Sequence, residues 1–343
     1  MQTSKKIGYL ALLCLSANVA AGQTQTARIV SAANTFLSTL DQQQRPRVLF
    51  SFDDKEQRVR WSNFPIRMVR RAGLSLGELN PSQRSAALAL LSSSLSRRGF
   101  QKVQEIMDGD EALKIKEGNN PMFGKDLFFI SIMGTPSEKD PWMLQFGGHH
   151  LALNITIAGE RGILTPTLTA AQPALYEWNG KTVRPLGQEN DKAFALLNAL
   201  DEKQQKQAVL NYRVADLVLG PGQDGKTIQP EGLKASSMNE QQRAMLLDVI
   251  SEWAAIVHDS AAAARMAEIK AGIMETWFAW SGPTTVTPGH NGTSYYRIQG
   301  PNLVIEYAPQ RMGGDPSMHI HTIYRDPTND YGRQITKSQI TKE

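Results

Sequence analysis

Residues 126–157 read DLFFISIMGTPSEKDPWMLQFGGHHLALNITI. Aromatic and β-branched residues alternate here with polar ones, and glycine and proline separate the runs, which is typical of antiparallel hairpins. Residues 294–325 have the same character. A third hairpin is predicted around Asn179-Gly180, between 174–178 and 181–185, because Asn-Gly favours the left-handed backbone of a tight turn.

Apolar residues recur at helical spacing outside these regions. They predict a first helix over 27–40, a second from the cap pair Asn80-Pro81 to Gly99, a third from Phe100 to about Ile115, and one long helix over 238–274. Helices and strands are clustered and do not alternate strictly, which favours an α+β fold: an antiparallel sheet or meanders from these hairpin regions, packed with several helices. No internal repeat is apparent, and a single compact domain over 22–343 is expected.

The N-terminus has the layout of a secretory signal peptide over residues 1–21. Lys5 and Lys6 precede an apolar stretch, and small residues lead to a predicted cleavage after Ala21. The apolar stretch is shorter than the roughly 20 residues of a membrane-spanning helix, so no stable membrane anchor is expected after cleavage. We therefore expect a periplasmic or secreted protein. Cys14 is the only cysteine, which excludes disulfides and cysteine metal ligands in the mature chain.

The charge balance argues against a nucleic-acid partner. The formal net charge is +4, and loss of Lys5 and Lys6 leaves about +2, with the basic residues scattered. Residues 220–227 match a phosphate-binding loop pattern, but that loop requires a helix that begins at its lysine. Pro230 and Gly232 follow too soon for such a helix, so a surface turn is predicted.

Four of the six histidines fall in two pairs. His319 and His321 are two residues apart in a predicted strand, so their side chains project from the same face and can chelate a divalent metal. Of the second pair, His150 is favoured as the third ligand because it shares a strand face with Asn154, whereas His149 shares one with apolar residues. Gly147 and Gly148 can re-aim either side chain, so both histidines are candidate ligands.

Charged residues near these histidines in sequence complete the candidate site. Glu306 or Asp326 would serve as a fourth ligand or general base, and Arg325 would orient an anionic or carbonyl group of a substrate. Imidazoles with one carboxylate suit zinc, or iron or manganese with open positions. The alternative is that the histidines are buried hydrogen-bonding residues and that Arg325 and Asp326 form a structural ion pair.

Aromatic residues cluster before and within the second strand region. They can line a pocket for a ring-bearing small molecule or pack in the core, and packing in the core is the favoured interpretation. They are Trp277, Phe278, Trp280, Tyr295, Tyr296 and Tyr307. His258-Asp259 is interpreted as a surface or helix-contact pair, because adjacent helical residues do not face each other.

Several blocks together resemble the domain-of-unknown-function family 3500. They are Trp61-Ser62-Asn63-Phe64-Pro65, Leu95–Phe100, Gly148-His149-His150-Leu151, Trp280–Pro283, Tyr295–Ile298, and His319-x-His321 with Arg325-Asp326-Pro327 and Asn329–Gly332. The resemblance covers about Ser51 to Gly332. It implies a single unit that brings the two histidine blocks together, and it implies no reaction and no ligand set.

Two functions are consistent with these observations. The first is an exported metal-dependent enzyme, a hydrolase or an oxygen-using oxidoreductase, that acts on a small molecule at the histidine site. The second is a non-catalytic periplasmic ligand-binding or scaffolding protein in which the histidines are structural.

Overall fold

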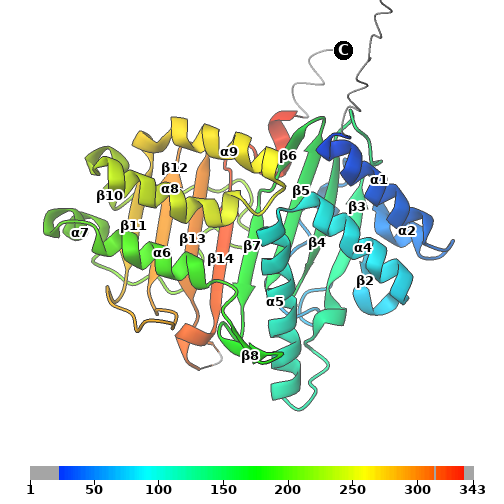
Figure 1. Ribbon diagram of the computed structural model, residues 1–343, viewed down its shortest axis with the longest axis horizontal. Coiled ribbons are helices and arrows are strands. Elements are labelled where there is room, and N and C mark those ends of the chain that lie inside the picture. The colour runs from blue at the N-terminus through cyan, green and yellow to red at the C-terminus, as the bar shows by residue number, and fades with distance from the viewer. Residues whose placement is uncertain (1–22, 313, 336–343) are drawn as a thin grey trace, which may run out of the picture.

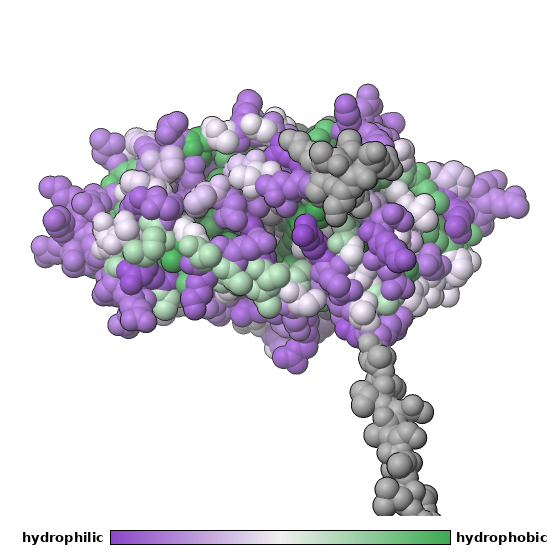
Figure 2. Space-filling model, turned by 90° about the horizontal axis from the view of Figure 1, so that it is seen from above, coloured by the Kyte–Doolittle hydropathy of each residue, from purple (hydrophilic) through white to green (hydrophobic). Residues whose placement is uncertain are grey.

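A computed structural model describes residues 23–312 and 314–335. The predicted signal peptide, residues 1–21, lies outside the described residues. In the part of the chain that the structure describes, no helix is long and apolar enough to cross a membrane. The surface seen from above is mostly hydrophilic, with apolar residues scattered between polar ones (Figure 2).

One mixed sheet runs the length of the molecule (Figure 1). Its twelve described strands follow the order β1-β3-β4-β5-β7-β14-β13-β12-β11-β10, with β2 on β3 and β6 on β5; all pairs are antiparallel except β1 with β3. The strands are β1 (Leu49–Phe50), β2 (Leu74–Ser75), β3 (Phe129–Met133), β4 (Trp142–Gly148), β5 (Leu151–Ala158), β6 (Arg161–Ile163), β7 (Thr167–Ala171), β10 (Leu233–Lys234), β11 (Trp277–Ser281), β12 (Tyr295–Gly300), β13 (Leu303–Pro309) and β14 (Ile320–Arg325). The predicted hairpin at Asn179-Gly180 is confirmed as β8 (Tyr176–Trp178) and β9 (Lys181–Val183).

Helices cover one face of this sheet (Figure 1). They are α1 (Gln25–Ser38), α2 (Arg45–Val48), α4 (Pro81–Ser94), α5 (Arg97–Lys116), α6 (Gly187–Asn198), α7 (Glu202–Ala208), α8 (Glu240–Ala254) and α9 (Asp259–Ala271). The short helix α3 (Lys55–Arg58) lies in a segment that covers the other face. Loop residues 51–72 and 210–232 cover that other face, where Trp61 and Leu217 pack on Ile323 of β14. The predicted α+β class is confirmed.

Two predicted helix boundaries are wrong. Both errors lie where the residue after α4 pairs with the segment after α8. Gly99 does not end α4; it lies in the first turn of α5, where a Cβ atom would come within 2.2 Å of the Ile256 carbonyl oxygen. The predicted helix over 238–274 is two helices, because residues 255–258 leave the helix to pair with the end of α4. His258 caps α9 by accepting a hydrogen bond from the Ala261 N–H and is buried.

The fold contains two similarly built halves, so the expectation of no internal repeat is wrong. In each half a short strand (β2 or β10) and a 3-10 turn are followed by two helices (α4 and α5, or α8 and α9) and then by the long antiparallel strands, and two helices (α1 and α2, or α6 and α7) come earlier in the chain. The first half also contains β1 and α3, which have no counterpart among the described residues of the second half. The antiparallel pairing runs β2-β3-β4-β5-β7 in the first half and β10-β11-β12-β13-β14 inward from the other edge. The halves therefore meet where β7 pairs with β14.

Matching hydrogen bonds support this duplication. The Gln83 side chain donates to the Thr39 carbonyl and to Gln44, and the Gln242 side chain donates to the carbonyl of residue 199 and to the side chain of residue 204. The sequence signals are short: Leu-x-x-Leu-Asp-x-x-Gln at 37–44 and 197–204, and Asn-x-x-Gln-Arg at 80–84 and 239–243.

Candidate metal centre

The Gly-His-His segment forms a turn and not a strand. Gly148 at the end of β4 pairs with Leu151 at the start of β5, so His149 and His150 are the two turn residues. Such turns need left-handed backbone, and His150 has φ +62°. The predicted reason for choosing His150, a strand face shared with Asn154, is therefore wrong. The turn sends the two imidazoles to different partners.

Strand β7 brings the two histidine segments together across the junction of the halves. Ala170 of β7 stands opposite His321 in the β7–β14 register, and its N–H donates to the His150 carbonyl at 2.8 Å. His319 comes directly before β14 and His321 lies within it. Both project to the loop-covered face, as the two-residue spacing predicts.

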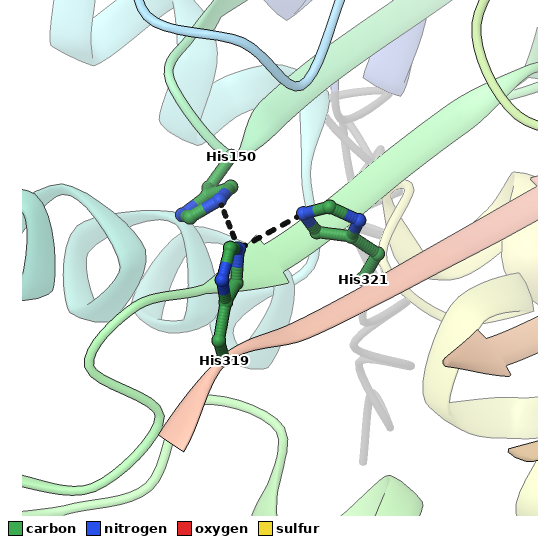
Figure 3. A group of neighbouring side chains, drawn as sticks. All are labelled: His150, His319 and His321. Atoms are coloured by element: carbon green, nitrogen blue, oxygen red, sulfur yellow. Dashed lines mark hydrogen bonds between the residues drawn. The ribbon is translucent and has the colours of Figure 1, made fainter. Parts of the chain in front are cut away.

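Three imidazoles converge at this point (Figure 3). The Nε2 atom of His319 lies 3.0 Å from Nε2 of His150 and 3.1 Å from Nε2 of His321. One donor atom from each ring falls within 4.8 Å of the others, a spacing that can hold a metal ion. Metal–nitrogen bonds are about 2.0–2.1 Å long, so one ion could contact two nitrogens that lie 3.0 or 3.1 Å apart.

The partners of the Nδ1 atoms fix the tautomers of two of these rings. The Nδ1–H of His319 donates to the Met312 carbonyl at 2.7 Å, and the Nδ1–H of His321 donates to the Asp216 carboxylate at 3.2 Å. In the neutral rings both Nε2 atoms then carry lone pairs, and these lone pairs face each other across 3.1 Å. A cation between them, either a proton or a metal ion, removes the repulsion.

The proton is disfavoured at this position. Burial lowers the pKa of His319 to about 4, and the neighbouring His321 adds to the lowering. Burial, together with His149 and the other two imidazoles, lowers the pKa of His150 well below its usual value. His150 and His319 are therefore neutral at physiological pH, which is the form that binds metals. The chemistry of the donor set fits a divalent metal.

His149 is not among the three converging histidines. Its Nδ1 atom lies 2.6 Å from the Asp110 carboxylate of α5, and its ring stacks on the His150 ring with centroids 3.7 Å apart. Asp110 also accepts a hydrogen bond from the Gly124 N–H. The His149 ring is thus held between Asp110 and the His150 ring. This placement does not support the prediction of His149 as a ligand.

Sequence reasoning missed Asp216 and Asn63, which both contact His321. The Asn63 amide nitrogen lies 3.4 Å from each ring nitrogen of His321. Asp216 has a side chain that is 54% exposed, whereas the three imidazoles belong to residues that are 3–7% exposed. The histidine group therefore lies directly beneath the surface at Asp216. Only the Trp61–Pro65 block pointed toward Asn63, and no signal in the sequence marks Asp216.

Glu306 lies on the same sheet face as His321 but is committed to the loop above it. Its carboxylate accepts hydrogen bonds from the N–H groups of Val218 and Leu219 and from the Tyr295 hydroxyl, at 2.7–2.8 Å. Burial raises the pKa of Glu306. Glu306 is not one of the converging donors; its contacts anchor the loop that carries Asp216.

Arg325 and Asp326 also make contacts away from the histidines. The buried guanidinium of Arg325 donates to the carbonyls of Leu219 and Gly220 and pairs with Asp224 and Asp330. Asp326 pairs instead with Arg265 of α9, beside a cavity of about 510 Å³ on the helix-covered side. Because Asp326 follows Arg325 directly, the pleat of β14 turns it to the opposite face. The structure does not bring either residue to the histidine group.

The other sequence candidates are structural. The aromatic residues Phe278, Trp280, Tyr295, Tyr296 and Tyr307 are buried, and Trp280, Tyr296 and Tyr307 stack in series. Residues 220–232 form turns with no helix, which agrees with the predicted surface turn.

Comparison with known proteins gives one match. The sequence model of a family described as "Protein of unknown function (DUF3500)" matches residues 22–333, which confirms the resemblance seen in the sequence. No curated protein and no solved structure matches the chain significantly.

Proposed function

We propose that this chain, which belongs to the DUF3500 family of proteins of unknown function, is an exported enzyme that uses a divalent metal. His150, His319 and His321 would hold the metal. Asn63 and Asp216, which both contact His321, would lie beside the metal. The exported location is inferred from the signal-peptide pattern of residues 1–21.

The facing lone pairs of His319 and His321 carry the proposal. Two imidazole nitrogens 3.1 Å apart, each with its Nδ1–H engaged elsewhere, repel each other through their lone pairs, and a metal ion between them would remove that repulsion. Buried histidines that merely pack or hydrogen-bond would direct an N–H toward an acceptor at this contact. Orientation of ligand histidines through the second ring nitrogen is the usual arrangement in metal sites.

A metal in this position supplies either hydrolytic or oxidative chemistry. It would polarise a substrate carbonyl or activate bound water, or, as iron or manganese, react with oxygen. Three neutral imidazoles with open positions suit zinc, and imidazole donors also suit iron. In both cases the protein would orient the ligands through Asp216 and the Met312 carbonyl and restrict water through burial of the rings.

Metal analysis of protein purified without a histidine tag tests the proposal. We expect about one equivalent of metal in the wild type and almost none in the His319→Ala/His321→Ala double variant. A matched control is His290→Ala, since His290 is exposed and lies outside the group. Equal metal content in all three proteins would refute the proposal.

The catalytic part of the proposal is tested on the metal-loaded protein. Turnover of a panel of esters and amides, or oxygen consumption with organic substrates, is expected to disappear after chelation and to return with metal. For export, the mature protein from the native host is expected to begin at Gly22.

The burial of the three histidines favours a second candidate, a non-catalytic exported binding or scaffolding protein with a structural metal or structural histidines. Each of these residues is at most 7% exposed. This candidate predicts that chelation lowers the melting temperature strongly while no substrate is turned over.

A further inference from the structure

A short loop contacts the candidate metal centre through its base. The Arg71 guanidinium donates to the carbonyls of Ser62, Phe64 and Gly148 at 2.7–3.1 Å. Both ends of segment 62–71 therefore meet beside the turn that carries His150. The N–H groups of Met68 and Val69 donate to the Pro65 carbonyl, so the segment is a compact Ω-loop, a type of loop that frequently carries function. We call it the 62–71 loop.

The base of the 62–71 loop touches the site itself. Asn63 is its second residue and contacts His321. Because the loop closes on itself within ten residues, no part of it lies farther than roughly 16 Å from that base. Its exposed side chains therefore lie within that distance of the residue that contacts His321.

Exposed apolar side chains occur in this loop and in the two other segments that contact the histidine group. Phe64 and Met68 are 39% and 62% exposed. Met312, whose carbonyl accepts the hydrogen bond from His319, is 73% exposed, and Val218, two residues after Asp216, is 40% exposed. Large apolar residues exposed together commonly mark a binding surface.

The same loop is strongly basic. Residues 59–72 contain Arg60, Arg67, Arg70 and Arg71 and no carboxylate. Arg67 and Arg70 are exposed and form no ion pair with any residue that the structure describes. Arg71 is committed to the loop's own carbonyls. Two exposed guanidinium groups in the loop whose base contacts His321 are therefore available to an anion.

The donor set adds to this positive charge. Three neutral imidazoles leave the charge of a dication uncompensated, since the group contains no carboxylate. Asp216 contacts His321 and is not itself one of the three donors. A metal centre of this kind favours an anionic ligand at its open positions.

We propose that the substrate is a small organic anion with an apolar body, such as a medium-chain or aromatic carboxylate. Its anionic end would lie at the metal between Arg67 and Arg70, and its apolar body would lie against Phe64, Met68 and Met312. This inference rests on the proposed function, because it requires the metal site.

Titration of the Co²⁺-loaded full-length mature protein tests the inference, with the visible absorption of Co²⁺ as the readout. The probes are acetate, octanoate and octanamide. Burial strengthens binding by about fourfold per methylene, so octanoate is expected to bind at least tenfold more tightly than acetate. Octanoate is also expected to bind at least tenfold more tightly than the neutral amide.

Two variants separate the two parts of the ligand. Arg67→Gln/Arg70→Gln should weaken octanoate about three- to tenfold, as expected for exposed charge pairs. Phe64→Ala/Met68→Ala should weaken octanoate and leave acetate unchanged. The charge-matched control is Lys203→Gln/Lys206→Gln, on the remote exposed helix α7, which should bind octanoate as the wild type does.

The outcomes distinguish the inference from the proposed function. Normal Co²⁺ uptake with equal affinity for all three probes, or an unchanged affinity in Arg67→Gln/Arg70→Gln, would overturn the substrate class and leave the metal site standing. Failure of the wild type to take up Co²⁺ would refute the proposed function and the inference with it.

Discussion

Replacement of Asp216 by alanine should weaken metal binding without removing a ligand. The Asp216 carboxylate accepts the Nδ1–H of His321 at 3.2 Å and also binds the Gln310 amide. Loss of such a partner in other metal sites weakens binding 10- to 100-fold. Because the Asp216 side chain is 54% exposed, water replaces part of this contact, and we expect the low end, about tenfold or about 1.4 kcal/mol.

The assay is competition for Zn²⁺ against a chromophoric chelator at neutral pH. His321→Ala provides the upper limit, since it removes a ligand. Glu138→Ala provides the control, since it removes one exposed carboxylate from the distant β3–β4 loop. If Asp216→Ala binds Zn²⁺ within twofold of the wild type while His321→Ala does not bind, the assigned role of Asp216 is wrong.

Three further predictions concern stability. In the metal-free protein the pKa of His319 is lowered from 6.5 to about 4, so between these pH values the unfolded chain takes up a proton that the folded chain does not. The free energy of unfolding should therefore fall by up to about 3 kcal/mol between pH 6.5 and pH 4. Denaturant titrations that give the same free energy of unfolding at both pH values would contradict this prediction. Gly99→Ala should lower the free energy of unfolding by about 1–3 kcal/mol, because its Cβ atom would meet the Ile256 carbonyl oxygen, whereas Gly272→Ala, with no neighbour nearer than 3.8 Å, should change it little. Arg325→Met should lower the melting temperature with and without metal, because removal of the guanidinium leaves buried ion-pair partners uncompensated at a cost of about 3–5 kcal/mol. An unchanged melting temperature together with lost substrate binding would instead support the substrate-orienting role predicted from the sequence.

Alternation and turn chemistry made the strands predictable. The segments 126–157 and 294–325 both form antiparallel strands, and Asn179-Gly180 forms its hairpin. The break in the helix over 238–274 was not predictable from periodicity, because residues 255–258 are apolar enough to continue a helix and leave it only to pair with a segment far away in sequence.

The similarity between the two halves is not apparent in the sequence for a related reason. The residues that the halves share are caps and side-chain hydrogen-bonding residues, such as Gln83 and Gln242, and they occupy few positions. Core residues vary between the halves because many apolar combinations fill the same volume. A search for paired capping patterns, and not for overall similarity, would have found it.

The histidine site was partly predictable. The spacing of His319 and His321 sufficed to place both imidazoles on one face. The pair His149-His150 suggested a third ligand, but the reason for preferring His150, a strand face shared with Asn154, was wrong. Glu306, Arg325 and Asp326 were chosen for proximity in sequence, and the sheet assigns each of them other partners. Asp216 comes from an irregular loop, where neither periodicity nor spacing carries information about position.

X-ray absorption at the edge of the bound metal in the purified untagged protein tests the central claim most directly. The account predicts an inner shell with three imidazole nitrogens at about 2.0–2.1 Å, completed by light oxygen ligands, and loss of the imidazole scattering in His319→Ala/His321→Ala. A shell without imidazole, or an identical spectrum from the double variant, would contradict it.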